Sequence, residues 1–74
     1  MKEYVINVSR IEELQTLHDL HELDLIFSRA RSTIVNGEKV VMVRTTGSAP
    51  PQKFDELSTL EDLELLRARV FKYL

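Results

Sequence analysis

Apolar side chains recur at every second position near the start of the chain. Tyr4, Ile6 and Val8 occupy these positions, and a period of two is typical of a half-buried strand. We therefore predict a strand from Lys2 to Val8. Ser9 follows it, and a serine hydroxyl at this point can accept a hydrogen bond from the first turn of a helix. The pattern predicts a helix that begins directly after Ser9.

The apolar pattern then changes to one residue in every three. These residues are Ile11, Leu14, Leu17, Leu20, Leu23 and Ile26. Three helical residues turn through about 300°, so a stripe with this spacing would wind around one straight helix instead of following one face. We therefore predict a bend between Asp19 and Glu22 that separates two helices. The first would bury Ile11, Leu14 and Leu17 with His18 beside them, and the second would bury Leu23, Ile26, Phe27, Ala30 and Ile34.

Asn36 and Gly37 admit two interpretations, because both residue types accept the positive φ angles of a helix cap and of a tight hairpin. In the first, the second helix continues to Val35 and the pair caps its carboxyl end. In the second, residues 33–35 form a strand and the pair makes a two-residue turn, which gives the order β-α-β-β-α. Ala30 and Ile34 continue the helical spacing, so we favour the cap.

A continuous apolar run from Val40 to Val43 predicts a buried strand within residues 38–45. We expect this strand to lie in the centre of the sheet, with a neighbour on each edge. Residues 45–51 include a glycine and two adjacent prolines, a composition typical of a loop. Two strands alone are seldom stable in water, so residues Gln52 to Leu57 are a candidate third strand. The pattern leaves open whether that strand forms.

A capping-box pattern begins at Ser58, because Ser58 and Glu61 have the spacing that satisfies the first free amides of a helix. We predict that a helix begins here. Its acidic residues lie near the start and its basic residues near the end, as the helix dipole favours. The predicted buried stripe is Leu60, Leu63, Leu66 or Arg67, Val70, Phe71 and Leu74.

These elements predict one small α+β domain over residues 1–74, in the order β-α-α-β-(β)-α, with helices covering a narrow sheet of two or three strands. The chain is 43% hydrophobic and 30% charged, which excludes the compositional class of disordered proteins. It contains no cysteine, which excludes disulfides and thiolate metal sites. It shows neither an apolar stretch of about 20 residues nor a signal-peptide pattern, so we expect a cytoplasmic protein that is not inserted in a membrane.

The net charge of −2 hides an asymmetry along the chain. Residues 1–28 hold two basic and six acidic residues, whereas residues 29–74 hold eight basic and six acidic residues. Such a distribution suits complementary contacts between two copies or with a partner protein.

The candidate residues for contacting phosphate are Arg29, Arg31, Lys39 and Arg44. Guanidinium groups match phosphate oxygens, and a basic edge can follow a nucleic-acid backbone. The chain is acidic overall and has few aromatic residues for stacking on bases. This composition favours a solvated helix end over a nucleic-acid site.

His18, His21 and Glu22 lie within about one helical turn, a spacing that can hold a divalent metal ion, but the three match no zinc-site pattern. The two glycines, Gly37 and Gly47, are too few for a glycine-rich phosphate loop. No serine or carboxylate lies in a recognisable catalytic motif. We therefore predict no enzyme activity, no bound metal and no cofactor.

The predicted function is a protein-interaction or assembly module that acts without catalysis. A small core and a narrow sheet with an apolar central strand favour self-association. We expect a two-fold dimer that either extends the sheet or pairs the terminal helices. The alternative is a nucleic-acid-binding accessory protein that uses the four basic residues named above.

Overall fold

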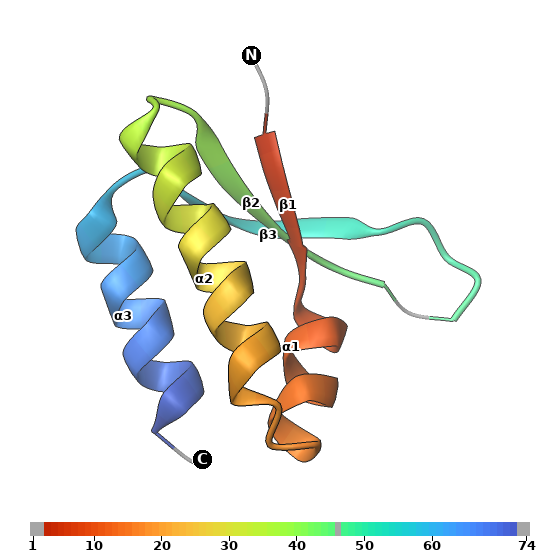
Figure 1. Cartoon of the computed structure of the whole chain (residues 1–74). Helices are drawn as coiled ribbons and strands as arrows, with labels where there is room; N and C mark the ends of the chain where they lie inside the picture. The colour runs from red at the N-terminus through yellow and green to blue at the C-terminus, as the bar shows by residue number, and fades with distance from the viewer. Residues whose placement is uncertain (1–2, 46, 73–74) are drawn as a thin grey trace.

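The computed structural model describes residues 3–45 and 47–72 (Figure 1). The elements follow the order β-α-α-β-β-α, which confirms the predicted α+β class. The alternative order, with a hairpin at Asn36 and Gly37, is wrong. The elements are β1 (Glu3–Asn7), α1 (Val8–Thr16), α2 (Leu20–Val35), β2 (Lys39–Arg44), β3 (Gln52–Leu57) and α3 (Leu60–Phe71).

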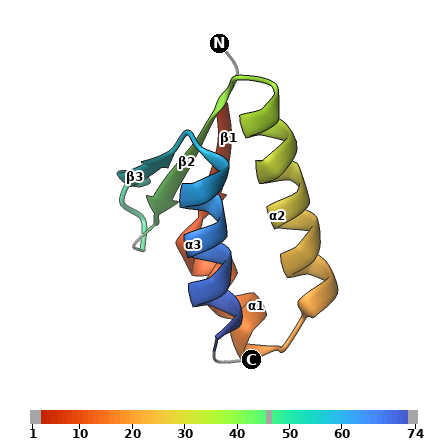
Figure 2. The same ribbon diagram turned by 90° about the vertical axis from the view of Figure 1, so that its left-hand side faces the viewer.

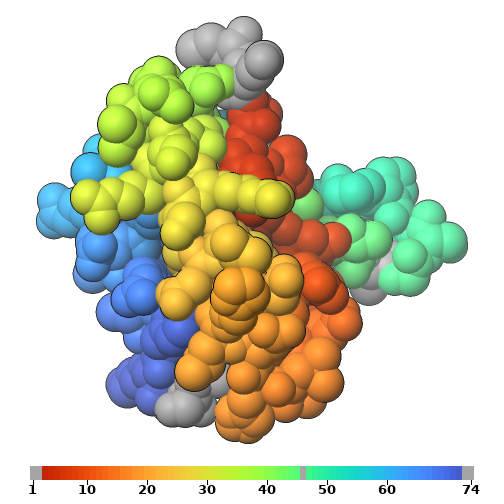
Figure 3. All heavy atoms as spheres, viewed as in Figure 1, coloured from red at the N-terminus to blue at the C-terminus, as the bar shows by residue number. Residues whose placement is uncertain are grey.

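β2 is the central strand of a three-stranded sheet of order β1-β2-β3, which confirms its predicted position. Residues Gln52–Leu57 form the third strand, a point that the sequence left open. It pairs in parallel with β1 and antiparallel with β3. The register with β3 shifts between Met42, which pairs with Asp55, and Val43, which pairs with Lys53, so Phe54 has no partner across the strands. The end of the β2–β3 hairpin projects from the rest of the molecule (Figure 3).

The helices cover one face of this sheet. Alternate residues of a strand point to opposite faces, and strand residues of one face share a buried cluster with the helices. The cluster contains Ile6, Ile11, Leu14, Leu23, Phe27, Ala30, Ile34, Val40, Met42, Leu57, Leu63 and Val70. The apolar stripe predicted for the second helix is therefore confirmed. On the opposite face, Val5 is 54% exposed, and no helix of the described chain packs there.

The first strand is shorter than predicted, and the first helix begins earlier. β1 ends at Asn7, whose side-chain oxygen accepts a hydrogen bond from the Ser9 amide at 2.9 Å. Asn7 rather than Ser9 therefore caps α1, because an asparagine side chain one position before the helix reaches its free amides as well as a serine does. Val8 belongs to the helix, and Lys2, the predicted start of the strand, lies outside the described residues.

The predicted break between the first two helices is present, but it lies earlier than predicted, at residues 17–19, and α2 already includes residues 20–22. His18, with a φ of 53°, lies in the connection, and the Asp19 side chain then caps α2 by accepting a hydrogen bond from the Glu22 amide at 3.2 Å. The prediction that Leu17 is buried is wrong. It lies beyond the last residue of α1 and is 64% exposed, so the spacing of α1 no longer determines where its side chain points. His18 is exposed for the same reason.

The carboxyl end of α2 is closed as the cap interpretation predicts. The Gly37 amide donates to the Ile34 carbonyl and the Glu38 amide donates to the Thr33 carbonyl, both at 2.9 Å. This pair of bonds is a Schellman motif, and it requires a left-handed residue at Gly37, whose φ is +82°. The motif reverses the chain so that β2 begins only two residues later.

α3 begins one residue later than predicted. Thr59 rather than Ser58 is the cap, because the Thr59 hydroxyl accepts a hydrogen bond from the Asp62 amide at 3.1 Å. Leu60, predicted to be buried, is 40% exposed, since it is the first residue of the helix and precedes the turn that packs on the core. The rest of the stripe buries Leu63 and Val70 fully and Leu66 and Phe71 partly, while Leu74 lies outside the described residues.

Candidate interaction surfaces

The four candidate phosphate-binding residues do not come together on one surface. Lys39 and Arg44 lie at opposite ends of β2, about 16 Å apart along the strand. Each is close to a carboxylate: the Lys39 ammonium is 3.8 Å from Glu56, and the Arg44 guanidinium is 2.9 Å from Glu12. These two cations are therefore partly neutralised within the protein.

Arg29 and Arg31 lie on different sides of α2, because two helical residues are separated by about 200°. Arg29 lines a cleft beside β1, whereas Arg31 lines a pocket between α2 and α3. Neither makes an ion pair with another residue of the described chain. Arg29 and Arg31 are therefore exposed cations at two separate surface depressions.

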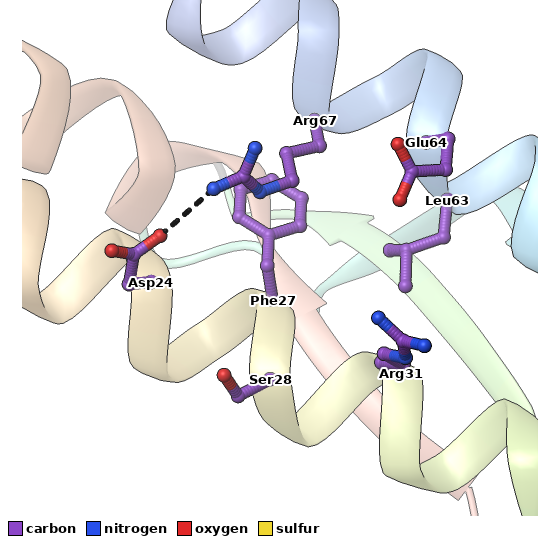
Figure 4. Close-up of a pocket in the computed structure, with 7 residues that line it drawn as sticks. All are labelled: Asp24, Phe27, Ser28, Arg31, Leu63, Glu64 and Arg67. Atoms are coloured by element: carbon purple, nitrogen blue, oxygen red, sulfur yellow. Dashed lines mark hydrogen bonds and ion pairs between the residues drawn. The ribbon is translucent and has the colours of Figure 1, made fainter.

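The pocket between α2 and α3 has a volume of about 350 Å³ (Figure 4). The Arg67 side chain reaches across it from α3, and its guanidinium is 3.1 Å from Asp24 on α2. The same guanidinium lies 4.7 Å from the centre of the Phe71 ring, and this ring is 5.9 Å from that of Phe27. The Arg67–Asp24 ion pair and the contact between Phe27 and Phe71 thus link the two helices, while the cation–π contact of Arg67 with Phe71 lies within α3. Arg67 and Asp24 therefore have a structural role here.

The outer face of the sheet carries alternating charges around valine side chains. Glu56 of β3 bonds to Lys53 and also lies beside Lys39 of β2. The hydrogen bond from Lys53 and the positive charge of Lys39 lower the pKa of Glu56, and the hydrogen bond to Glu56 raises the pKa of Lys53. These charges, the register shift at Phe54 and the preceding prolines protect the β3 edge from pairing with another strand.

The β1 edge has none of these protective features. A cleft of about 310 Å³ is lined by four consecutive β1 residues, Tyr4 to Asn7, together with Arg10, Glu22, Ile26 and Arg29. No β2 residue lines it, so the cleft lies along the edge of β1 that pairs with no strand of the described chain. Side chains of α2 lie directly beside those of β1 on the surface (Figure 3). The sequence pattern identified β1 but not which of its edges stays open.

A second cleft, of about 220 Å³, separates α3 from β3. From α3 it is lined by Asp62, Leu65, Leu66 and Arg69, and we call these four residues the α3 stripe. Leu65 is 61% exposed although leucine is usually buried. Leu65 is not among the residues that the sequence pattern selects, because it falls outside the helical spacing of the buried stripe. That departure from the spacing is the signal that could have identified it.

A third groove, of about 290 Å³, is more apolar than the three depressions described above and adjoins the α3 stripe through Leu66 and Arg69. Phe54, left unpaired by the register shift, forms its outer wall and is 56% exposed. At its other side the Gln15 amide donates a hydrogen bond to the Val70 carbonyl at 3.0 Å, which ties α1 to α3.

His18 and His21 are exposed, whereas Glu22 is partly buried and lines the β1 cleft. Among residues 3–45 and 47–72, no three His, Asp or Glu side chains come together in a way that could hold a metal ion. In the same residues no helix combines the length and the apolar character needed to cross a bilayer. No family model, no curated protein and no solved structure matches this chain.

Proposed function

We propose that the protein is a protein-interaction module that acts without catalysis, by associating with a second copy of itself through α3. The observation that carries this proposal is the order of charges along the α3 stripe. Asp62 lies toward the start of the helix, Arg69 toward its end, and the exposed Leu65 and its neighbour Leu66 lie midway between them. Neither charged side chain forms an ion pair within the described chain.

This arrangement is self-complementary in a two-fold dimer. When two α3 helices pack antiparallel about an axis between Leu65 and Leu66, Asp62 faces Arg69 of the partner subunit, and Arg69 faces Asp62 of the partner subunit. The leucines meet at the axis, where they exclude water. Asp55 of β3 also lines this cleft and adds a second carboxylate near the guanidinium of the partner subunit.

The contact is small, and we expect weak association. α3 has 12 residues and is therefore about 18 Å long. Exposed ion pairs contribute about 0.2–1 kcal/mol each, so burial of Leu65 and Leu66 has to supply much of the affinity. Sedimentation equilibrium from about 1 µM to about 1 mM covers association free energies of about −8 to −4 kcal/mol.

Complementary charge reversals test this proposal. In Asp62→Arg, the new cation would face Arg69 of the partner subunit, and in Arg69→Asp two carboxylates would face each other. Each variant alone should lose about 1–2 kcal/mol of association free energy, about 5–30-fold in Kd. An equimolar mixture restores both opposite-charge pairs and should associate as tightly as the original protein, as sedimentation of one fluorescently labelled variant would measure.

Glu64→Arg is the matched control, because Glu64 lies on α3 but lines the pocket between α2 and α3 instead of the α3 stripe. It should leave association unchanged. Circular dichroism melts would establish that all three variants fold. A wild-type protein that stays monomeric over the whole concentration range, or a mixture that associates no better than the separate variants, would exclude dimerisation through α3.

A further inference from the structure

The two edges of the sheet differ in how they resist pairing with another strand. β3 is preceded by two prolines, contains a register shift and carries three charged residues. β1 has neither proline nor register shift, and Glu3 is its only charged residue. Its backbone therefore presents a regular row of hydrogen-bonding groups on the side away from β2. This edge can accept a further strand.

The position of α2 determines what kind of strand fits. α2 stands beyond β1, on the side away from β2 (Figure 2). Its residues Glu22, Ile26 and Arg29 form one wall of the cleft, and the β1 backbone forms the other. A second copy of the chain that paired its β1 here by two-fold symmetry would bring its own α2 against this one. A single extended segment has no such helix and fits the cleft.

The charges of the cleft select the side chains of that segment. Arg10 is held by Glu13 at 3.1 Å, whereas Arg29 makes no ion pair with any other residue of the described chain. The lining thus holds one cation without an ion-pair partner, Arg29, and one carboxylate, Glu22; Arg29 is exposed, whereas Glu22 is partly buried. An acidic side chain on the segment would meet the free guanidinium, whereas a basic one would be repelled.

We propose that this cleft binds an extended, acidic segment of a partner protein, which adds to β1 as a fourth strand. Main-chain hydrogen bonds to the alternate β1 residues whose backbone groups face away from β2 hold the segment in a manner that is independent of its sequence. Its alternate side chains point toward the helices, where they pack on Tyr4 and Ile26 and where one carboxylate reaches Arg29. The proposal does not depend on dimerisation through α3.

The test uses immobilised eight-residue peptides in which threonine occupies every second position and the positions between carry valine with one aspartate, so that valine and aspartate share one face of the strand. Matched peptides carry lysine in place of the aspartate. The labelled full-length protein should bind the aspartate peptides about fivefold more tightly or better. Arg29→Glu should reverse this preference, so that the lysine peptides bind more tightly. Arg31→Glu is the matched control, since it makes the same change two residues away on the other side of α2, and it should keep the original preference.

Backbone amide shifts locate the binding site on the folded protein. Addition of the best aspartate peptide should shift the amides of residues 3–7 and leave those of residues 52–57 unchanged. Equal binding of both peptide sets, an equal effect of Arg29→Glu and Arg31→Glu, or shifts confined to β3 would each overturn the proposal. Displacement of the peptide by a single-stranded oligonucleotide at low salt would also overturn it, because it would identify the cleft as a nucleic-acid site.

Discussion

At the scale of single residues, Gly37 is a position where backbone conformation alone decides which residue is tolerated. Apart from its chain neighbours, no heavy atom lies within 4 Å of a Cβ placed there, so an added Cβ meets open space, but φ is +82°. We expect Gly37→Val to lower the free energy of unfolding by about 1–2 kcal/mol, because a β-branched residue resists the left-handed region. Urea denaturation would measure this loss.

Gly37→Asn is the control for this change, since asparagine accepts left-handed geometry more readily than other non-glycine residues. It should cost clearly less than Gly37→Val. Equal costs for both would contradict the assignment of strain to φ.

The exposure of a single side chain was harder to predict than the apolar spacing of the helix around it. Leu17 fits the three-residue spacing as well as Leu14 does, yet it falls one residue beyond α1 and faces solvent. Ser58 and Thr59 can both cap a helix, and the capping-box spacing of Ser58 with Glu61 favoured Ser58, although the cap is Thr59. Helix ends are decided by tertiary packing of the first and last turns, which local sequence does not contain.

At the scale of elements, the start of α3 provides a direct test of which residue is the cap. Thr59→Ala removes the hydroxyl that accepts a hydrogen bond from the Asp62 amide, and it should lower the free energy of unfolding by about 1 kcal/mol. Ser58→Ala makes the same kind of change one residue earlier and should be close to neutral. Thermal or urea denaturation of both variants measures the difference, and a larger loss in Ser58→Ala would contradict the observed cap.

The type and order of most elements were predictable because those elements carry their own periodic signal, whereas β3 carries none and its formation was left open. The stripe from Leu23 to Ile34 specified α2, and the apolar run from Val40 to Val43 specified a central strand. The parallel pairing of β1 with β2 was not predictable in the same way. The alternation of apolar and polar residues in a strand identifies its buried face but not the strand beside it. That neighbour depends on the path of the chain through the two helices between β1 and β2.

At the scale of the whole molecule, the candidate sites depend on what the fold leaves uncovered. Three helices cover one face of the sheet, and the order β1-β2-β3 places the two edge strands on opposite sides. The basic residues selected from the sequence were dispersed by this arrangement, because sequence proximity does not determine which side of α2 or which end of β2 a residue occupies. The open β1 edge and the α3 stripe could be recognised only once the sheet order was known.

The positions of these two surfaces predict that both can be occupied at the same time. The α3 stripe lies beside β3, whereas the cleft proposed to bind an acidic segment lies beside β1. Occupation of one surface therefore leaves the other accessible. We expect the protein, with saturating aspartate peptide, to sediment as a dimer that carries two peptides. Arg29→Glu should dimerise with unchanged affinity, and Arg69→Asp should retain the preference for aspartate peptides. If the peptide dissociates the dimer, or if either variant alters both properties, the two surfaces are not independent, and at least one of the two proposed binding surfaces is wrong.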